Sequence, residues 1–434
     1  MMEPGQKILF KIALTAHRDG NLTRAQQYYE QILTQSPHQP EVAYNLALLH
    51  ISQENITTAI TLLEKVLNIN PAHLDALNNL GALMLKTDQS EQALHCFSTV
   101  ITIEPDHTEA RNNLAATLLQ MDRYFHAAQH YKTLLEQTPD DIGARYSYGI
   151  ALMESDDLQE AIHQFENILV ERPNHLNAQS NLGIAHLKKG NTEKAKAIFN
   201  KVLAENPDRP EISYLYSALT GDNIPEKPPQ QYIQHLFDQY AKNYDAHMTT
   251  GLAYEAPQKL KVLLDNNFEI KDLKIADLGC GTGLSGSAFK SSAILLHGVD
   301  LSPKMLALAE QKNIYDKVFP GDLVDFLKNS PLPYDLLLAA DTLNYFGDLT
   351  EFFHGAHHAL TPSGLILFSL EDGEDNKLWA LQKSGRYTHS ENYIRQKCRD
   401  HGFDIIALEK SSLRRQNHEL VMGWLCLLQR NYSL

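Results

Sequence analysis

The sequence contains few cysteines. Its 434 residues include Cys96, Cys280, Cys398 and Cys426, which are scattered along the chain without a CxxC pair or a Cys/His ligand spacing. Disulfide frameworks and structural zinc sites depend on such pairs or spacings. We therefore expect no metal site and no disulfides, and we expect a reducing, cytoplasmic environment.

Long apolar runs and clusters of basic residues are also missing. No stretch approaches the ~18 uncharged apolar residues of a membrane-spanning helix, and residues 1–20 have the pattern of an amphipathic helix rather than of a signal peptide. The formal net charge is −15, whereas a protein that follows a phosphate backbone needs a basic face. We expect neither a membrane nor a nucleic acid as a partner.

The first half of the chain repeats a pattern every 34 residues. Each unit has helically spaced apolar residues, so it is predicted to be two helices, the second of which ends before a proline. One unit cannot bury its apolar face alone, so the units are expected to stack into an all-α solenoid. The recurring positions are Pro37, Pro71, Pro105, Pro139, Pro173 and Pro207, and Ala25, Ala59, Ala93, Ala127, Ala161 and Ala195.

These six units, from about residue 6 to 207, resemble the tetratricopeptide repeat family. The resemblance implies a superhelix whose concave face binds peptides or other proteins, so a protein or peptide partner is expected. Residues 209–219 have the pattern of a final capping helix. The repeat domain is therefore predicted to span residues 1–219.

A row of asparagines marks the expected concave face. Asn45, Asn79, Asn113 and Asn181 occupy the same position in four units. An amide side chain donates to and accepts from a peptide backbone at once, so the row predicts a groove that holds an extended polypeptide. The alternative is that asparagine is simply the usual residue at that position of the repeat.

The second half alternates between strand-like and helix-like segments. Residues 220–231 contain three prolines among polar residues and are predicted to be a stiff, exposed linker. In residues 232–434 the alternation indicates an α/β domain with a parallel sheet. The last two strands are separated by only eight residues, so they are expected to form an antiparallel hairpin. The predicted strands are 274–279, 295–300, 317–322, 334–341, 364–371, 403–410 and 419–430, and the helices between them lie near 284–291, 303–312, 350–360 and 390–401.

The motif that indicates chemistry follows the first of these strands. It reads Asp277-Leu278-Gly279-Cys280-Gly281-Thr282-Gly283. Glycines allow the backbone to turn sharply and to approach a ligand, and the helix that follows offers free N–H groups. Asp300 ends the second strand, where a carboxylate can accept both hydroxyls of a ribose. The motif predicts a nucleotide-like ligand at this edge of the sheet.

A nicotinamide cofactor is the first alternative, because Gly281, Gly283 and Gly286 fit the dinucleotide fingerprint, which is a weak signal alone. Three features favour another ligand. Asp277 precedes the glycines, where it can meet a cationic amino group. The chain has one nucleotide-binding half, followed by a hairpin. The third strand ends in Gly321-Asp322, which can place a carboxylate at the exocyclic amine of adenine.

Together these residues resemble the class I S-adenosylmethionine-dependent methyltransferases over about residues 230–434, and the whole chain resembles a group of bacterial methyltransferases with tetratricopeptide repeats. The resemblance implies a Rossmann-like seven-stranded fold and S-adenosylmethionine as cofactor. Tyr240 and Tyr244 lie on a segment similar to the cofactor-covering helix of small-molecule methyltransferases, although packing along one helix face also explains them. The other cofactor residues that it implies are Asp277, Gly279, Cys280, Gly281, Gly283, Asp300, Leu301, Met305, Asp322, Leu323 and Ala340.

The sequence does not identify the methyl acceptor or a catalytic residue. Asp341-Thr342-Leu343-Asn344 lacks the Asp/Asn-Pro-Pro-aromatic motif that is used to methylate amino groups of bases or glutamine. Candidate acceptor residues follow the fourth and fifth strands, where such sheets bind ligands: Asn344, Tyr345, Arg386 and His389. Arg386 suits a carboxylate or phosphate, whereas Arg414 and Arg415 are expected in a solvated turn.

Two functions fit these sequence features. In the first, the enzyme methylates a small acidic or quinone-like molecule, and the repeats mediate protein interaction or oligomerisation. In the second, the repeats recruit a polypeptide that is itself methylated. A scaffold that binds the cofactor without turnover is disfavoured, because the acidic and glycine positions are intact.

Overall fold

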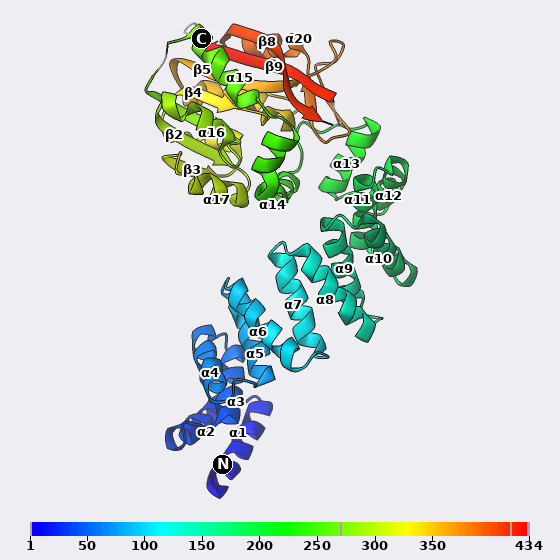
Figure 1. Cartoon of the computed structure of the whole chain (residues 1–434), viewed down its shortest axis with the longest axis vertical. Helices are drawn as coiled ribbons and strands as arrows, with labels where there is room; N and C mark the ends of the chain where they lie inside the picture. Colours follow the sequence, from blue (N-terminus) through cyan, green and yellow to red (C-terminus); the bar gives the residue numbers. More distant parts are fainter. Residues whose placement is uncertain (1, 270, 417–418, 432–434) are drawn as a thin grey trace. The chain divides into compact units, whose positions relative to one another are not determined.

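A computed structural model describes residues 2–269, 271–416 and 419–431 (Figure 1). Contacts divide the chain into two compact units, Met1–Ile198 and Phe199–Leu434. No helix within the described ranges is long and apolar enough to cross a membrane.

The first unit consists of packed pairs of consecutive helices, as the 34-residue period predicts. Each second helix of a pair ends two residues before the proline of its repeat, which confirms the predicted stop. The helices are α1 (Pro4–Arg18), α2 (Leu22–Gln35), α3 (Pro40–Ser52), α4 (Ile56–Ile69), α5 (Leu74–Lys86), α6 (Ser90–Ile103), α7 (Thr108–Gln120), α8 (Tyr124–Gln137), α9 (Ile142–Glu154), α10 (Leu158–Glu171), α11 (Leu176–Lys188) and α12 (Thr192–Glu205), which runs past Ile198.

Small residues are needed where the two helices of a repeat meet. A Cβ added to Gly81 would lie 2.7 Å from Cε1 of Phe97, and one added to Gly149 would lie 2.6 Å from Cε1 of Phe165. Both rings are fully buried. The repeated small residue therefore allows an aromatic side chain of the second helix to pack against the backbone of the first.

The turns inside the repeats share one backbone feature that the sequence pattern did not reveal. The residue two places past the first helix of each pair is left-handed, with φ between +57° and +83°. Left-handed φ is costly for residues with a Cβ and suits glycine. Only two of the six positions are glycine: the set is Gly20, Glu54, Asp88, Asp122, Asp156 and Gly190.

The second unit is built on a mostly parallel sheet. The order β3-β2-β1-β4-β5 is parallel, β9 pairs antiparallel with β5, and β8 pairs antiparallel with β9. The predicted terminal hairpin and the seven main strands are thereby confirmed. The strands are β1 (Leu273–Leu278), β2 (Ala293–Asp300), β3 (Lys317–Pro320), β4 (Tyr334–Ala339), β5 (Leu360–Asp372), β6 (Trp379–Leu381), β7 (Tyr387–His389), β8 (Phe403–Gln416) and β9 (Glu419–Arg430).

Helices cover both faces of this sheet (Figure 1). Successive side chains of a strand point to opposite faces, so Ala276 packs in the cluster that holds α18, α19 and α20, and Ile275 packs with α15 and α16 on the other face. The helices are α13 (Pro210–Thr220), α14 (Gln230–Ala246), α15 (Ala256–Asn267), α16 (Leu284–Phe289), α17 (Pro303–Gln311), α18 (Leu323–Lys328), α19 (Thr350–Ala359) and α20 (Glu391–Asp400), with short helical turns at His247–Gly251, Lys290–Ser292 and Leu343–Tyr345.

Contacts group α13 with the sheet. The hydroxyl of Tyr214 donates to the carbonyl oxygen of Gly385 at 2.6 Å, and the rings of Tyr214 and Tyr232 lie 5.5 Å apart. Tyr214 is 1% exposed. The domain limits at residues 219 and 231 and the capping role of this helix stay predictions, and Tyr214 and Ala218 of α13 pack with Leu381 and Tyr387 of the second unit.

We had expected the proline-rich segment after α13 to be simply exposed, and the structure shows that it is not. The hydroxyl of Tyr387 donates to the oxygen of Pro225 at 2.7 Å, and the N–H of Gly347 donates to the oxygen of Glu226 at 2.6 Å. Pro228 is buried. The segment is therefore attached to the second unit through its backbone.

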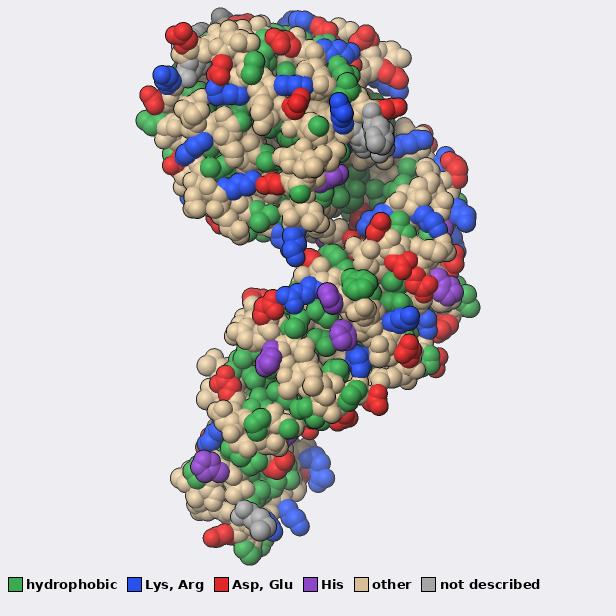
Figure 2. All heavy atoms as spheres, viewed as in Figure 1, with side chains coloured by type: hydrophobic (Ala, Val, Ile, Leu, Met, Phe, Trp, Pro, Cys, Tyr) green, Lys and Arg blue, Asp and Glu red, His purple; other side chains and the backbone are tan. Residues whose placement is uncertain are grey.

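Acidic and basic side chains are interspersed on the described surface that Figure 2 shows, and blue and red spheres alternate over both units. On this face they do not gather into a broad basic band.

Candidate functional site

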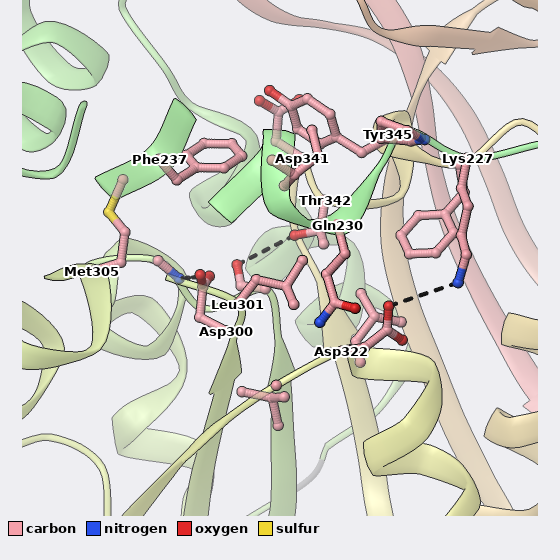
Figure 3. A pocket seen from close by; sticks show the side chains of 18 of the residues that line it. Lys227, Gln230, Phe237, Asp300, Leu301, Met305, Asp322, Asp341, Thr342 and Tyr345 are labelled. Carbon is pink, nitrogen blue, oxygen red and sulfur yellow. Dashed lines mark hydrogen bonds and ion pairs between the residues drawn. The ribbon is translucent and has the colours of Figure 1, made fainter. Parts of the chain in front are cut away.

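A pocket opens at the carboxyl ends of β1, β2 and β4 (Figure 3). β1 lies between β2 and β4, so the chain crosses over in opposite directions on its two sides, which is where open α/β sheets bind ligands. The cavity, including its mouth, has a volume of about 850 Å³. The predicted residues that line it are Gly279, Gly281, Asp300, Leu301, Met305, Asp322, Leu323, Ala340, Tyr244 and Tyr345.

The glycine turn forms the floor of this pocket. Gly279 has φ +70°, and a Cβ there would lie 2.3 Å from Cγ2 of Thr342. Gly281 has φ +53°, and the nearest atom to its added Cβ would be Cε1 of Tyr244 at 3.8 Å. Gly279 therefore allows β1 and β4 to approach each other, whereas Gly281 keeps the pocket itself open.

Asp300 is held in place by main-chain donors. Its Oδ2 accepts from the N–H of Gly281 at 2.8 Å, and its Oδ1 accepts from the N–H of Ser302 at 2.9 Å. Burial raises the pKa of Asp300 to about 6, although these hydrogen bonds favour its charged form. The carboxylate is thus fixed between the glycine turn and the start of α17.

Asp277 lies beneath the turn and does not line the pocket. The hydroxyl of Tyr315 donates to its Oδ2 at 2.7 Å, while Oδ1 is buried without a hydrogen-bond partner among the described residues. Burial raises the pKa of Asp277 to about 7. A buried acceptor without a partner is costly, so this atom is suited to receive a donor from a bound ligand.

The other end of the pocket carries Asp322. Its Oδ1 caps α18 by accepting from the N–H of Val324 at 2.7 Å. Its Oδ2 lies 4.0 Å from Nζ of Lys227, as the dashed line in Figure 3 shows. The apolar side chains of Leu301, Met305 and Leu323 also line the pocket, and Figure 3 shows Leu301 between Asp300 and Asp322.

Besides Asp277, three of the predicted cofactor residues do not line this pocket. Cys280 is 3% exposed, and burial raises the pKa of its thiol well above the usual value. Gly283 has φ +92°, and its Cα packs against the side chain of Tyr315. Tyr240 lines a neighbouring cavity and has its ring 5.2 Å from that of Tyr244.

Helix α14 covers the pocket and is held by two carboxylates that the sequence pattern did not single out. Asp238 accepts from the hydroxyl of Ser302 at 2.5 Å, and Asp245 pairs with Lys312 at 2.6 Å and with the hydroxyl of Thr282. Asp238 and Asp245 are seven residues apart, as are Phe237 and Tyr244, which both line the pocket. This seven-residue spacing along one helix is a sequence signal that could have identified them.

A second cavity shares Phe237, Tyr244, Asp341 and Tyr345 with the first. Arg386 and Arg414 border it, and both pair with Asp341 and Glu371. Arg414 is 6% exposed and lies within β8, so our expectation of a solvated turn at this residue was wrong. Arg415 is exposed. The two arginines and two carboxylates balance one another in charge.

Asp341 is the residue on which this cluster converges. It has φ +59°, and its Oδ1 accepts from Nδ2 of Asn344 at 2.8 Å and from both arginines. A left-handed φ at a residue with a Cβ persists only where surrounding contacts hold it, and such residues cluster at functional sites. Asp341 borders both cavities.

Two predicted acceptor residues lie away from both cavities. Asn344 is fully buried, and its Oδ1 accepts from the N–H of Glu371 at 2.7 Å. Nε2 of His389 lies 2.9 Å from the oxygen of Gly347, and burial lowers the pKa of His389 to about 4. The structure thus gives Asn344 and His389 positions inside the protein, whereas it brings Tyr345 and Arg386 to the second cavity.

The asparagines of the repeat row already donate within the first unit. Nδ2 of Asn79 and of Asn181 donate to the hydroxyls of Tyr44 and Tyr146, each at 3.0 Å. The amide donors of the other two, Asn45 and Asn113, bond the oxygen of Glu41 at 2.8 Å and Oδ1 of Asn78 at 3.1 Å. A peptide held by this row would have to use the amide oxygens or displace these bonds, so the groove stays a prediction.

Comparison with protein families matches the two halves of the chain to different families, and the repeat match runs past the boundary between the two units at residue 198. A methyltransferase domain family matches residues 276–366, and a tetratricopeptide repeat family matches residues 152–219. The family of anaphase-promoting complex, cyclosome, subunit 3 matches residues 18–100.

The curated relatives match the second half. A malonyl-(acyl-carrier protein) O-methyltransferase of Priestia megaterium is 31% identical over 32% of this chain and 51% of its own length. A second O-methyltransferase of that name, from Ilyobacter polytropus, is 26% identical over 45% and 78%. Human methyltransferase-like protein 27 is 29% identical over 33% and 59%. The chain spans about half the length of the first of these relatives.

Among solved structures, the first half is similar to YrrB, described as a tetratricopeptide repeat protein with an unusual peptide-binding site. The identity is 21% and the TM-score 0.40, over 42% of this chain and 93% of that one.

Proposed function

The chain carries tetratricopeptide repeats in its first half and a methyltransferase domain in its second, and from this premise we propose that it transfers a methyl group from S-adenosylmethionine to an acidic acceptor. The proposal rests on the position of Asp300. The N–H groups of Gly281 and Ser302 fix its carboxylate beside the glycine turn. A carboxylate at the end of the second strand of such a sheet suits the hydroxyls of a ribose.

The rest of the pocket fits the same cofactor. The unpartnered Oδ1 of Asp277 beneath the turn is suited to the amino group of the methionine part, and Oδ2 of Asp322 at the far end to the adenine amine. Phe237 and Tyr244 on α14 would exclude water from the region between. When bound, S-adenosylmethionine supplies an electrophilic methyl group, so the protein has mainly to align the reactants.

The second cavity is our candidate acceptor site, since it shares Asp341 and Tyr345 with the cofactor pocket. Arg386 would bind an acidic acceptor by exchanging one of its two carboxylate partners, because a guanidinium pairs well with planar oxyanions. A carboxylate acceptor needs no general base, and His389 is buried away from the cavity. The relatives named as O-methyltransferases of an acyl-carrier-protein-bound acid support this class of acceptor.

A protein acceptor is the second candidate, and the repeats favour it, since such arrays commonly bind polypeptides. The two candidates overlap if a carrier protein presents the acid. A small acceptor that is acidic or quinone-like requires only the second cavity.

Calorimetric titration with S-adenosylhomocysteine and with NAD tests the cofactor. We expect the first to bind and the second not to bind. NAD binding without S-adenosylhomocysteine binding would refute the proposal. For the acceptor, the purified chain is incubated with methyl-labelled S-adenosylmethionine and a bacterial extract, and the label is followed into proteins and into small acids. Base-labile label, typical of a methyl ester, is expected. Base-stable label alone would exclude a carboxylate acceptor.

A further inference from the structure

The proline-rich segment of residues 225–230, which ends at the first residue of α14, forms a strap along the cofactor pocket. Lys227, Pro228 and Gln230 line the same pocket as Asp300 and Asp322. These strap residues lie outside the stretch that matches the methyltransferase family, which begins at residue 276. A wall of the pocket is therefore made by a segment that joins the repeats to the domain.

The strap has a defined position. Its backbone accepts hydrogen bonds at Pro225 from Tyr387 and at Glu226 from Gly347, at 2.7 and 2.6 Å. Pro228 is buried, and Pro229 precedes the first residue of α14. The two backbone hydrogen bonds and the three prolines leave the segment few conformations, so the backbone that carries Lys227 and Gln230 is held in place.

Gln230 is the last residue of the strap and the first residue of α14, and it is an exposed residue. Figure 3 shows its amide reaching into the pocket between Leu301 and Asp322. The amide makes no hydrogen bond in the described part of the chain, although neighbouring polar groups such as Asp300 and Asp322 are engaged. The amide of Gln230 lies among apolar side chains and a carboxylate, and its hydrogen-bond donors and acceptor are therefore available to a ligand.

The chemistry of this arrangement matches adenine. A glutamine amide both donates and accepts hydrogen bonds. It can therefore donate to the ring nitrogen N7 of adenine and accept from the exocyclic amine. The carboxylate oxygens of Asp322 accept hydrogen bonds, and Nζ of Lys227 lies 4.0 Å from Oδ2. Building on the proposed methyltransferase function, we propose that Gln230 recognises the adenine edge of the cofactor together with Asp322, so that the strap determines nucleobase specificity.

The test compares two ligands on the full chain. S-adenosylhomocysteine carries the adenine amine, and S-inosylhomocysteine carries a carbonyl in its place. We expect Gln230→Ala to weaken S-adenosylhomocysteine about 3- to 10-fold, as for the loss of a net hydrogen bond, and to change S-inosylhomocysteine much less. The ratio of the two dissociation constants should therefore fall. Gln231→Ala, at the adjacent exposed glutamine, is the matched control and should leave both constants unchanged.

The outcomes separate this proposal from the one on which it rests. An unchanged ratio in Gln230→Ala, including an equal loss for both ligands, would overturn the role in adenine recognition while leaving the methyltransferase proposal intact. Failure of the unaltered chain to bind S-adenosylhomocysteine would refute the proposed function itself. Circular dichroism melting of Gln230→Ala and Gln231→Ala checks that both variants fold.

Discussion

At the residue scale, Asp300 joins the glycine turn to the cofactor pocket, and its protonation should control affinity. Burial raises its pKa to about 6, so the charged form predominates above that pH. Ribose hydroxyls donate to the charged form, so binding of S-adenosylhomocysteine should strengthen as the pH rises from 5 to 8, with the change centred near pH 6. Calorimetric titration with S-adenosylhomocysteine between pH 5 and pH 8 measures this change in affinity.

Asp300→Asn provides the control for this pH profile. The variant should bind about 1.5–3 kcal/mol more weakly, the usual contribution of a hydrogen bond to a charged group. It should lose the change centred near pH 6 and keep only the change near pH 7 that the titration of Asp277 causes. Equal affinity of the unaltered chain at pH 5 and pH 8 would contradict the role given to Asp300.

The buried Asp277 should reduce the stability of the ligand-free protein at neutral pH. Its pKa is raised to about 7 in the folded chain, above the value of an exposed Asp, so its favourable contribution is complete in acid and is lost as the pH rises through 7. Asp277→Asn should therefore raise the free energy of unfolding at pH 8 by roughly 2–4 kcal/mol, since one pKa unit corresponds to about 1.4 kcal/mol.

Urea unfolding at pH 8 and at about pH 4 measures this effect, and the gain should be small near pH 4, because the destabilisation develops between the pKa of an exposed Asp and about 7. The same variant should bind S-adenosylhomocysteine more weakly, because an amide does not attract the cationic amino group. A variant that is destabilised at pH 8 would show that the carboxylate is stabilised by a partner other than Tyr315.

At the scale of the element, the left-handed turns of the repeats allow a paired test. Glu54 has φ +61° and is exposed, and Gly190 has φ +83° at the equivalent position with no atom within 4 Å of an added Cβ. Glu54→Gly should stabilise the chain by about 1 kcal/mol, and Gly190→Ala should destabilise it by a similar amount, since a Cβ disfavours left-handed φ by ~1–2 kcal/mol.

Thermal unfolding of the two variants checks both signs. If both substitutions destabilise the chain, the turn is controlled by side-chain contacts of Glu54 and not by its backbone.

The helices and main strands could be predicted from the sequence, whereas a site built from several separate segments could not. The 34-residue period and the strand–helix alternation are local signals, so the helix pairs and main strands were found. β6 and β7 have three residues each, too few for a period, and α18 has six. The ion-pair cluster at the second cavity draws Asp341, Glu371, Arg386 and Arg414 from four separate segments. Only the order of the strands brings these charges together.

The cofactor site shows the same division. Gly279, Gly281 and Asp300 lie in one continuous motif and its neighbouring strand, so sequence spacing was enough to place them at one pocket. Lys227 and Gln230 lie in a segment whose prolines are typical of a linker, and no local signal distinguishes a free linker from one that hydrogen-bonds to Gly347 and Tyr387.

At the scale of the whole molecule, the contacts of α13 determine where the chain can be cut into stable fragments. Tyr214 is buried against the second unit, and loss of a buried aromatic side chain costs roughly 3–5 kcal/mol. A fragment of residues 206–434 should therefore be more stable in urea than one of residues 220–434 by about that amount. Equal midpoints for the two fragments would show that α13 contributes nothing to the second unit.

The longer fragment also separates the two candidate functions. Every residue that lines either cavity lies between residues 227 and 414, so residues 206–434 should bind S-adenosylhomocysteine as the full chain does. If the acceptor is a small acid, the fragment should also match the full chain in turnover, because the repeats contribute nothing to either cavity. If the repeats recruit a protein acceptor, the fragment should retain cofactor binding and lose methylation of that protein, mainly through a raised KM. Loss of cofactor binding by the fragment would contradict both functions, since it would place part of the cofactor site within residues 1–205.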